Sequence, residues 1–100
     1  VSFQLVAAAG EARSLAFEAL EKAKAGDFDA AAKLMKQSKD VEIKAHHIQT
    51  QLLSTEAAGE HLSVDVLLVH AQDHLMCSML AQELVQELIC LYERTAAKNA

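Results

Sequence analysis

The sequence contains no proline, no tryptophan and only three glycines, and aromatic residues make up 4% of it. Without proline, long helices can run without interruption. With so few turn-forming residues, the chain cannot supply the many turns of an all-β sandwich or barrel. Hydrophobic residues make up 52% of the 100 positions, slightly above the roughly 45–50% of an average globular domain. We therefore predict one all-α domain, over residues 1–100, with a packed core.

Basic residues are also scarce, with nine Lys and Arg against 14 Asp and Glu and a net charge of −5. This balance argues against nucleic-acid binding, which needs clustered basic side chains. No apolar run reaches the length of roughly 18 residues needed for a membrane span, and no secretory signal is recognisable. The start at Val1 suggests that a short native segment is missing. Cys77 and Cys90, about 20 Å apart on one helix, predict free thiols and a cytosolic location.

Apolar spacing and helix-ending residues predict three helices, at about 1–25, 28–53 and 64–98. Gly26 follows the first helix, where a left-handed residue is favoured, and Asp27 is a suitable N-cap for the second. Because this connection is so short, the first two helices must be antiparallel. The pattern as a whole predicts an antiparallel three-helix bundle.

Gly10 lies inside the first helix, where a glycine usually marks the close approach of a neighbouring helix. The second connection is expected over 54–63, with Ser63 or Asp65 starting the third helix. The expected buried stripes are Leu5, Ala8, Ala12, Leu15, Ala19 and Ala23 in the first helix, and Leu34, Ser38, Val41, Ala45, Ile48 and Leu52 in the second.

The third helix is apolar on more of its surface than a three-helix bundle can cover. A second stripe with heptad spacing remains beside the core face, which indicates self-association through this helix. It consists of Val66, Val69, Asp73, Cys77, Leu80, Leu84 and Leu91. Asp73 would then bring like charges together, and these repel unless a proton or a cation neutralises them. A hard divalent ion such as Mg²⁺ suits carboxylate ligands, whereas a polar residue that only sets the register needs no metal.

Two histidines, His70 and His74, share one face of the third helix at i, i+4. Spacing alone leaves three interpretations open: satisfied interfacial histidines, a zinc-type site completed by an acid, or a nucleophilic imidazole. His46 lies near the predicted core stripe and His47 nearer solvent, and adjacent residues cannot chelate one ion together. Both are expected to be structural, and His61 lies in the second connection.

The string Val69–Met76, VHAQDHLM, resembles the signature of the IIA component of the lactose/cellobiose-type sugar phosphotransferase system, which uses phosphoenolpyruvate. Further segments along nearly the whole chain are similar to the same family. They are Ala9–Ser14, Ala25–Phe28, and Ala45-His46 with Gln49-Thr50. Cys77 departs from the pattern, since threonine is more often expected there.

The resemblance implies a fold and an activity. The family forms an antiparallel three-helix bundle that trimerises through its third helices into a nine-helix assembly in the cytoplasm. It is a phosphotransferase component that carries a phosphoryl group on a histidine, which matches His70. The family's metal-binding aspartate, shared among three subunits, matches Asp73 and implies one structural Mg²⁺ per trimer. Gln72 and His74 match positions beside the phosphohistidine and receive supporting roles.

The resemblance also implies partners. Phosphorylated HPr donates the phosphoryl group, the cysteine of a IIB component accepts it, and the membrane IIC permease is an indirect partner that imports a disaccharide of the lactose or cellobiose/chitobiose type. Met76 and Met79 are candidates for an adaptable docking surface. Two alternatives stay open: a metal-binding oligomerisation module that uses His70, Asp73 and His74, and a purely structural helical oligomer.

Overall fold

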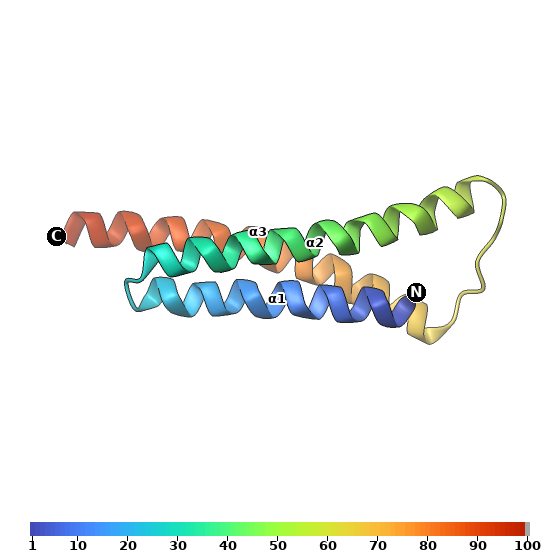
Figure 1. The fold of residues 1–100 in the computed structure, drawn as a ribbon, viewed down its shortest axis with the longest axis horizontal. Coiled ribbons are helices and arrows are strands. Elements are labelled where there is room, and N and C mark those ends of the chain that lie inside the picture. The colour runs from blue at the N-terminus through green and yellow to red at the C-terminus, as the bar shows by residue number, and fades with distance from the viewer. Residues whose placement is uncertain (100) are drawn as a thin grey trace.

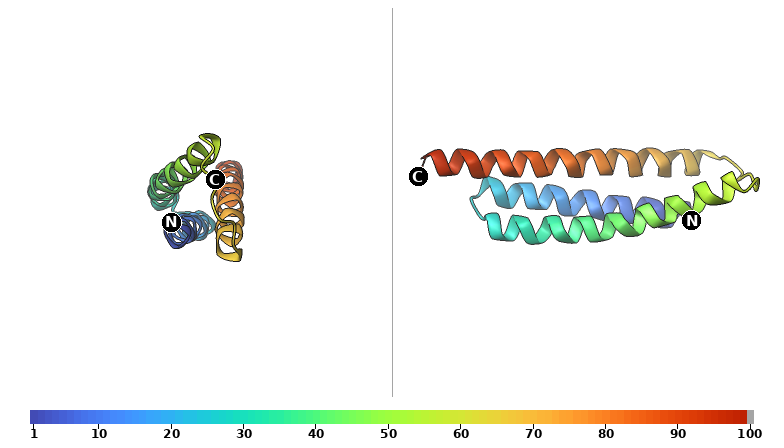
Figure 2. Two further views of the ribbon diagram at one scale, coloured as in Figure 1. Left: turned by 90° about the vertical axis from the view of Figure 1, so that its right-hand side faces the viewer. Right: turned by 90° about the horizontal axis from the view of Figure 1, so that it is seen from above.

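The computed structural model describes residues 1–99 as three long helices. These are α1 (Ser2–Lys24), α2 (Phe28–Ala57) and α3 (Val66–Asn99). Neighbours in sequence run antiparallel (Figure 1), and in the end-on view of Figure 2 the helices lie at the corners of a triangle. No strand occurs within the described range. The expectation of an all-α three-helix chain is therefore confirmed, and residue 100 lies outside the described residues.

The turn between α1 and α2 forms where the sequence predicts it. Gly26 has φ +84°, a left-handed conformation that glycine adopts without strain. The side chain of Asp27 accepts a hydrogen bond from the backbone N–H of Ala30 at 3.1 Å. This cap satisfies one of the free N–H groups at the start of α2 and fixes the antiparallel pairing.

The second connection is shorter than predicted, because α2 continues past Leu53 to Ala57. No glycine or proline interrupts the chain there, and the next left-handed residue is Gly59, with φ +90°. At the other end of the connection, the side chain of Asp65 accepts a hydrogen bond from Leu68 N at 2.8 Å. Asp65 rather than Ser63 therefore caps α3.

α1 is the central helix and packs closely against both neighbours, whereas α2 and α3 contact each other much less. Its buried face is built mainly of alanine, which allows the helices to approach closely. Seven residues are buried: Leu5, Ala9, Ala12, Ala16, Ala19, Leu20 and Ala23. The predicted positions Ala8 and Leu15 are only partly buried. Because the buried Ala9 and Ala16 stand next to the predicted Ala8 and Leu15, the sequence pattern could not place the core face to within one residue.

A buried polar layer joins the three helices in the middle of the bundle. The Ser38 hydroxyl of α2 donates to the carbonyl of Ala12 in α1 at 2.6 Å. The Gln82 amide of α3 donates to that Ser38 hydroxyl at 2.8 Å. One turn away, Ser78 donates to the carbonyl of Ala9 at 2.8 Å. These bonds satisfy side chains that are shielded from water, and they fix the register of the helices.

Ser38→Ala is expected to destabilise the fold by about 1–3 kcal/mol, because the buried Gln82 amide loses its acceptor. The measurement is the free energy of unfolding in urea. The matched control is Ser14→Ala, which removes an exposed hydroxyl from α1 and should change stability by less than about 0.5 kcal/mol. Equal effects of the two substitutions would contradict this role of the polar layer.

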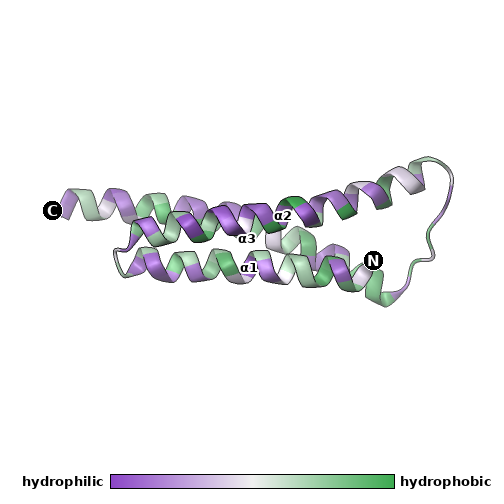
Figure 3. Ribbon diagram, in the orientation of Figure 1, coloured by the Kyte–Doolittle hydropathy of each residue, from purple (hydrophilic) through white to green (hydrophobic). Residues whose placement is uncertain are grey.

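The side of α3 that faces away from the core carries a line of exposed apolar side chains, and apolar positions recur along this helix in Figure 3. The large exposed members are Val66, Val69, Met76, Leu80, Leu84, Leu88, Leu91 and Tyr92; we call this set the α3 apolar face. By length and composition alone, α3 is long and apolar enough to cross a membrane. One such helix is weak evidence for a membrane span. The excess apolar surface predicted for the third helix is present.

Candidate functional site

Two stacked imidazoles lie in the first half of α3, on the border between its exposed face and α1. The ring centroids of His70 and His74 are 5.8 Å apart and their planes differ by 20°. One helical turn separates the two residues, which places both side chains on the same side of α3. His70 is exposed and His74 is half-buried. The outer ring is therefore open to a partner, while the inner ring lies against the protein.

Gly10 of α1 lies against the inner ring. A Cβ atom added at Gly10 would lie 3.3 Å from Nε2 of His74, closer than the roughly 3.5–4.0 Å of a comfortable contact. The close neighbour predicted for this glycine is therefore the His74 ring. Sequence spacing did not identify this pair, because it joins residues on different helices.

Asp73 is exposed on the same side of α3 as the α3 apolar face. The Cys77 thiol, one turn on, lies 3.7 Å from Oδ1 of Asp73 and donates a weak hydrogen bond to it. Cys77 and Cys90 are both free and exposed, so the prediction of unbridged cysteines is confirmed. A carboxylate and a thiol thus lie among the exposed apolar side chains of this part of α3.

Gln72 lies on a different side of α3 from the histidine pair. It lines a depression of about 140 Å³ between α2 and α3, together with Gln49 and Leu52 of α2. Side chains two positions apart on a helix do not face each other. Within one chain, the structure therefore brings His74 to His70 but does not bring Gln72 to it.

The metal-binding alternative finds no support in the single chain. Among residues 1–99, no group of three or more His, Cys, Asp or Glu side chains is arranged to hold a metal ion. His70, Asp73 and His74 therefore do not form a chelating set on their own, although they are close in sequence.

The other histidines lie apart from the stacked pair. His61 contacts the Glu56 carboxylate in an exposed pair, and His47 is exposed on α2. The expectation that His46 lies near the core is wrong, because His46 is exposed. It lines an open depression between α2 and α3 with Glu42 and Glu83.

Glu42 in this depression has a pKa raised above its ordinary value of 4.5. Partial burial is the main cause and repulsion by Glu83 the second, while His46 and Lys39 act in the opposite direction. Sequence reasoning did not find this group, because its two carboxylates come from different helices. The folded state therefore holds the Glu42 proton to a higher pH than the unfolded chain does.

The raised pKa predicts that Glu42→Gln stabilises the fold near neutral pH. An acid whose pKa is raised by folding loses stability as the pH rises through the folded value. The gain should therefore be present above that value and disappear below pH 4.5. Because Glu42 is partly solvated, we expect less than about 1 kcal/mol, measured by urea unfolding at several pH values. A gain that grows as the pH falls would contradict the assignment.

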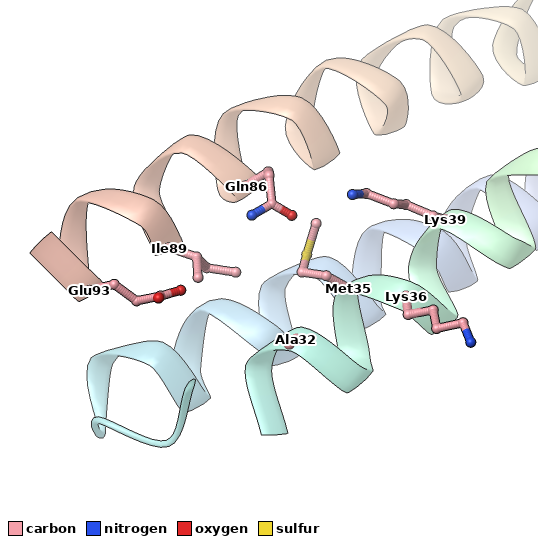
Figure 4. A pocket seen from close by; sticks show the side chains of 7 residues that line it. All are labelled: Ala32, Met35, Lys36, Lys39, Gln86, Ile89 and Glu93. Carbon is pink, nitrogen blue, oxygen red and sulfur yellow. The ribbon is translucent and has the colours of Figure 1, made fainter. Parts of the chain in front are cut away.

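Another depression, of about 310 Å³, lies between α2 and α3 nearer the first turn. Figure 4 shows side chains from both helices around it. They are Ala32, Met35, Lys36, Lys39, Gln86, Ile89 and Glu93. None of its lining residues belongs to the histidine pair. The stacked imidazoles thus lie on an open surface and not in this hollow.

The comparisons with known proteins agree on one family. The family model described as "PTS system, Lactose/Cellobiose specific IIA subunit" matches residues 1–93. The N,N'-diacetylchitobiose-specific EIIA component of Escherichia coli strain K12 is 50% identical over 93 residues, which cover 93% of this chain and 80% of that protein. The span that the family model matches contains the positions of His70, Asp73 and His74.

Solved structures give the same result. The cellobiose-specific enzyme IIA of Bacillus anthracis matches with a TM-score of 0.95 and 46% identity, over 97% of this chain and 89% of that one. A chain from the IIA(chitobiose)–HPr complex of Escherichia coli matches with a TM-score of 0.83 and 47% identity, over 95% and 92%. The chain therefore belongs to the lactose/cellobiose-specific IIA family and is a phosphotransferase component of a sugar phosphotransferase system.

Proposed function

We propose that this chain is a phosphocarrier that accepts a phosphoryl group from phosphorylated HPr on His70 and passes it to the cysteine of a IIB component. The observation that carries the proposal is the His70 imidazole, which is exposed and stacked on a second ring at the edge of the α3 apolar face. An exposed ring can meet a histidine or a cysteine on another protein. The solved IIA(chitobiose)–HPr complex of a relative supports HPr as the donor.

The reaction requires a neutral His70 imidazole, because its unprotonated nitrogen forms the bond to phosphorus. In the first step a nitrogen of His70 forms a bond to phosphorus while the bond from phosphorus to the HPr histidine breaks. In the second step the cysteine thiolate of IIB attacks phosphorus and the His70 nitrogen leaves, so that no net proton or electron is consumed by the carrier itself. Phosphoryl transfer depends mainly on alignment and on screening of charge. In this proposal His74 supports the His70 ring. The apolar side chains around His70 exclude water and so limit hydrolysis of the phosphohistidine. Gln72, the other predicted supporting residue, would act from another subunit.

The active form in this proposal is a homotrimer joined through the α3 apolar face, which gives nine helices in all. The support is the exposure of large apolar side chains such as Leu80 (56%) and Leu91 (58%) in the single chain. A monomer rarely exposes so long an apolar line. Assembly also explains why α3 has apolar residues on the side opposite to its core face.

Asp73 would lie within that interface, where carboxylates from three subunits meet. Three oxygen donors suit a hard divalent ion such as Mg²⁺, and each chain contributes one exposed carboxylate. The ion would neutralise the carboxylates and would have a structural role, with no part in phosphoryl transfer. The Cys77 thiol beside Asp73 is a softer donor that Mg²⁺ does not prefer.

The remaining parts of the proposal concern partners and location. Met76 is exposed and Met79 half-buried, and both line one open depression of about 420 Å³ near the α3 apolar face. Flexible side chains of this kind suit docking to two unlike partners. We place the chain in the cytoplasm, with the IIC permease as an indirect partner. The sugar is a disaccharide of the lactose or cellobiose/chitobiose type, as in the relatives.

A transfer assay tests the proposal. The chain is incubated with catalytic enzyme I, HPr and labelled phosphoenolpyruvate, and a IIB component of a chitobiose or cellobiose system is then added. The expected result is an acid-labile label on the chain that moves to IIB within seconds to minutes. A chain that stays unlabelled while HPr is fully phosphorylated would contradict the phosphocarrier function.

A further inference from the structure

Gly10 occupies a special place in α1, opposite the stacked imidazoles of α3. Its missing side chain leaves room for the His74 ring, because a Cβ atom there would lie 3.3 Å from Nε2. The same His74 ring stacks on His70, with centroids 5.8 Å apart. His74 therefore contacts both Gly10 of α1 and the outer ring of His70.

Two contacts constrain the His74 ring, one with Gly10 and one with His70. His74 is half-buried between α1 and His70, whereas His70 is exposed on its outer side. A Cβ atom at Gly10 therefore requires the His74 ring to shift by a few tenths of an ångström. Because the two rings are stacked, with 20° between their planes, a shift of His74 changes the surface against which the His70 ring lies.

We propose that Gly10 is a positioning residue for phosphoryl transfer, because the space above it seats His74, and His74 in turn holds the His70 ring in its reactive orientation. This inference rests on the proposed function of His70. Helix propensity argues against any local benefit from glycine, since alanine is the better helix former at an interior position. The glycine is therefore best explained by the ring that it accommodates.

The substitution Gly10→Ala separates the effect of glycine on helix stability from its effect on the position of the His74 ring. The substitution should leave the thermal midpoint of unfolding unchanged or raise it, because alanine favours α1. Small displacements in a reacting geometry lower rates strongly, so the rate of labelling by phosphorylated HPr should fall by about fivefold to tenfold. The matched control is Ser14→Ala, on the exposed side of the same helix, which should label at the wild-type rate.

A double variant shows whether Gly10 acts through His74. In the His74→Ala background the ring is absent, so Gly10→Ala should change the labelling rate by less than about twofold. The inference is overturned if Gly10→Ala labels at the wild-type rate, or if it lowers the rate equally with and without His74. If Gly10→Ala instead lowers the thermal midpoint, the double variant should regain it, and failure to regain it also overturns the inference.

The histidine ring signals in NMR spectra give a readout that needs no phosphoryl donor. Gly10→Ala should move the ring signals of both His74 and His70, whereas those of His47, exposed on α2, should stay in place. Unchanged His70 signals would contradict the positioning role. This measurement does not depend on labelling, so it tests the contact between Gly10 and His74 by itself. A wild-type chain that is never phosphorylated would overturn the proposed function, but it would leave this test of the positioning role in place.

Discussion

His70→Ala is expected to reduce labelling by phosphorylated HPr to background. The imidazole nitrogen is the atom that bonds to phosphorus in the proposed step, and no other side chain can replace a covalent nucleophile that has been removed. His74 lies next to it but is half-buried against Gly10, so a donor that docks on the exposed side does not reach it. The measurement is the acid-labile phosphate bound per chain after prolonged incubation.

The control for this loss is His47→Ala, which removes an exposed histidine from α2. It should label as the wild type does, and circular dichroism should show the same helix content for both variants. His74→Ala should fall between these results, with slower labelling but the same final amount of phosphate. Full labelling of His70→Ala would show that another residue carries the phosphoryl group.

Asp73→Leu is expected to tighten the trimer. In the proposed assembly three carboxylates meet inside an apolar interface, and replacement of such buried charges by apolar side chains often stabilises an assembly by about 1–4 kcal/mol. The leucine would also continue the line formed by Leu80 and Leu91. Sedimentation at increasing dilution measures the concentration at which half of the trimer dissociates, and this value should fall for the variant.

A chelator separates the role of the ion from that of packing. Wild-type trimers should dissociate more readily when divalent ions are removed, because the Asp73 carboxylates then repel each other. The Asp73→Leu trimer should not respond to the chelator. The matched control is Asp40→Leu, at an exposed position of α2, which should keep the wild-type response. A monomeric wild type at all concentrations, with or without Mg²⁺, would contradict the proposed assembly.

The helix boundaries were predicted correctly where the sequence has distinctive turn and N-cap residues. Gly26 and Asp27 provide a left-handed residue and an N-cap, and the turn forms at that point. The end of α2 was predicted too early because the chain past Leu53 has no helix-breaking residue before Gly59. The core face of α1 was displaced by one residue at Ala8 and Leu15, since alanine on neighbouring positions hides the periodicity.

The site was only partly predictable, for a different physical reason. The pairing of His70 with His74 follows from their i, i+4 spacing on one helix. The seat of His74 on Gly10 and the bond from Gln82 to Ser38 depend on how separate helices are placed against each other. The exposed α3 apolar face was predictable from the excess of apolar positions at heptad spacing in the third helix.

Mapping the phosphoryl group within the labelled chain is the most direct test of the role of His70. The wild-type chain is phosphorylated by HPr, digested under alkaline conditions that preserve phosphohistidine, and the peptides are sequenced by mass spectrometry. We predict one phosphoryl group per chain, located on His70. A phosphoryl group found on His74, His46 or any other residue, with His70 unmodified, would contradict the proposed mechanism.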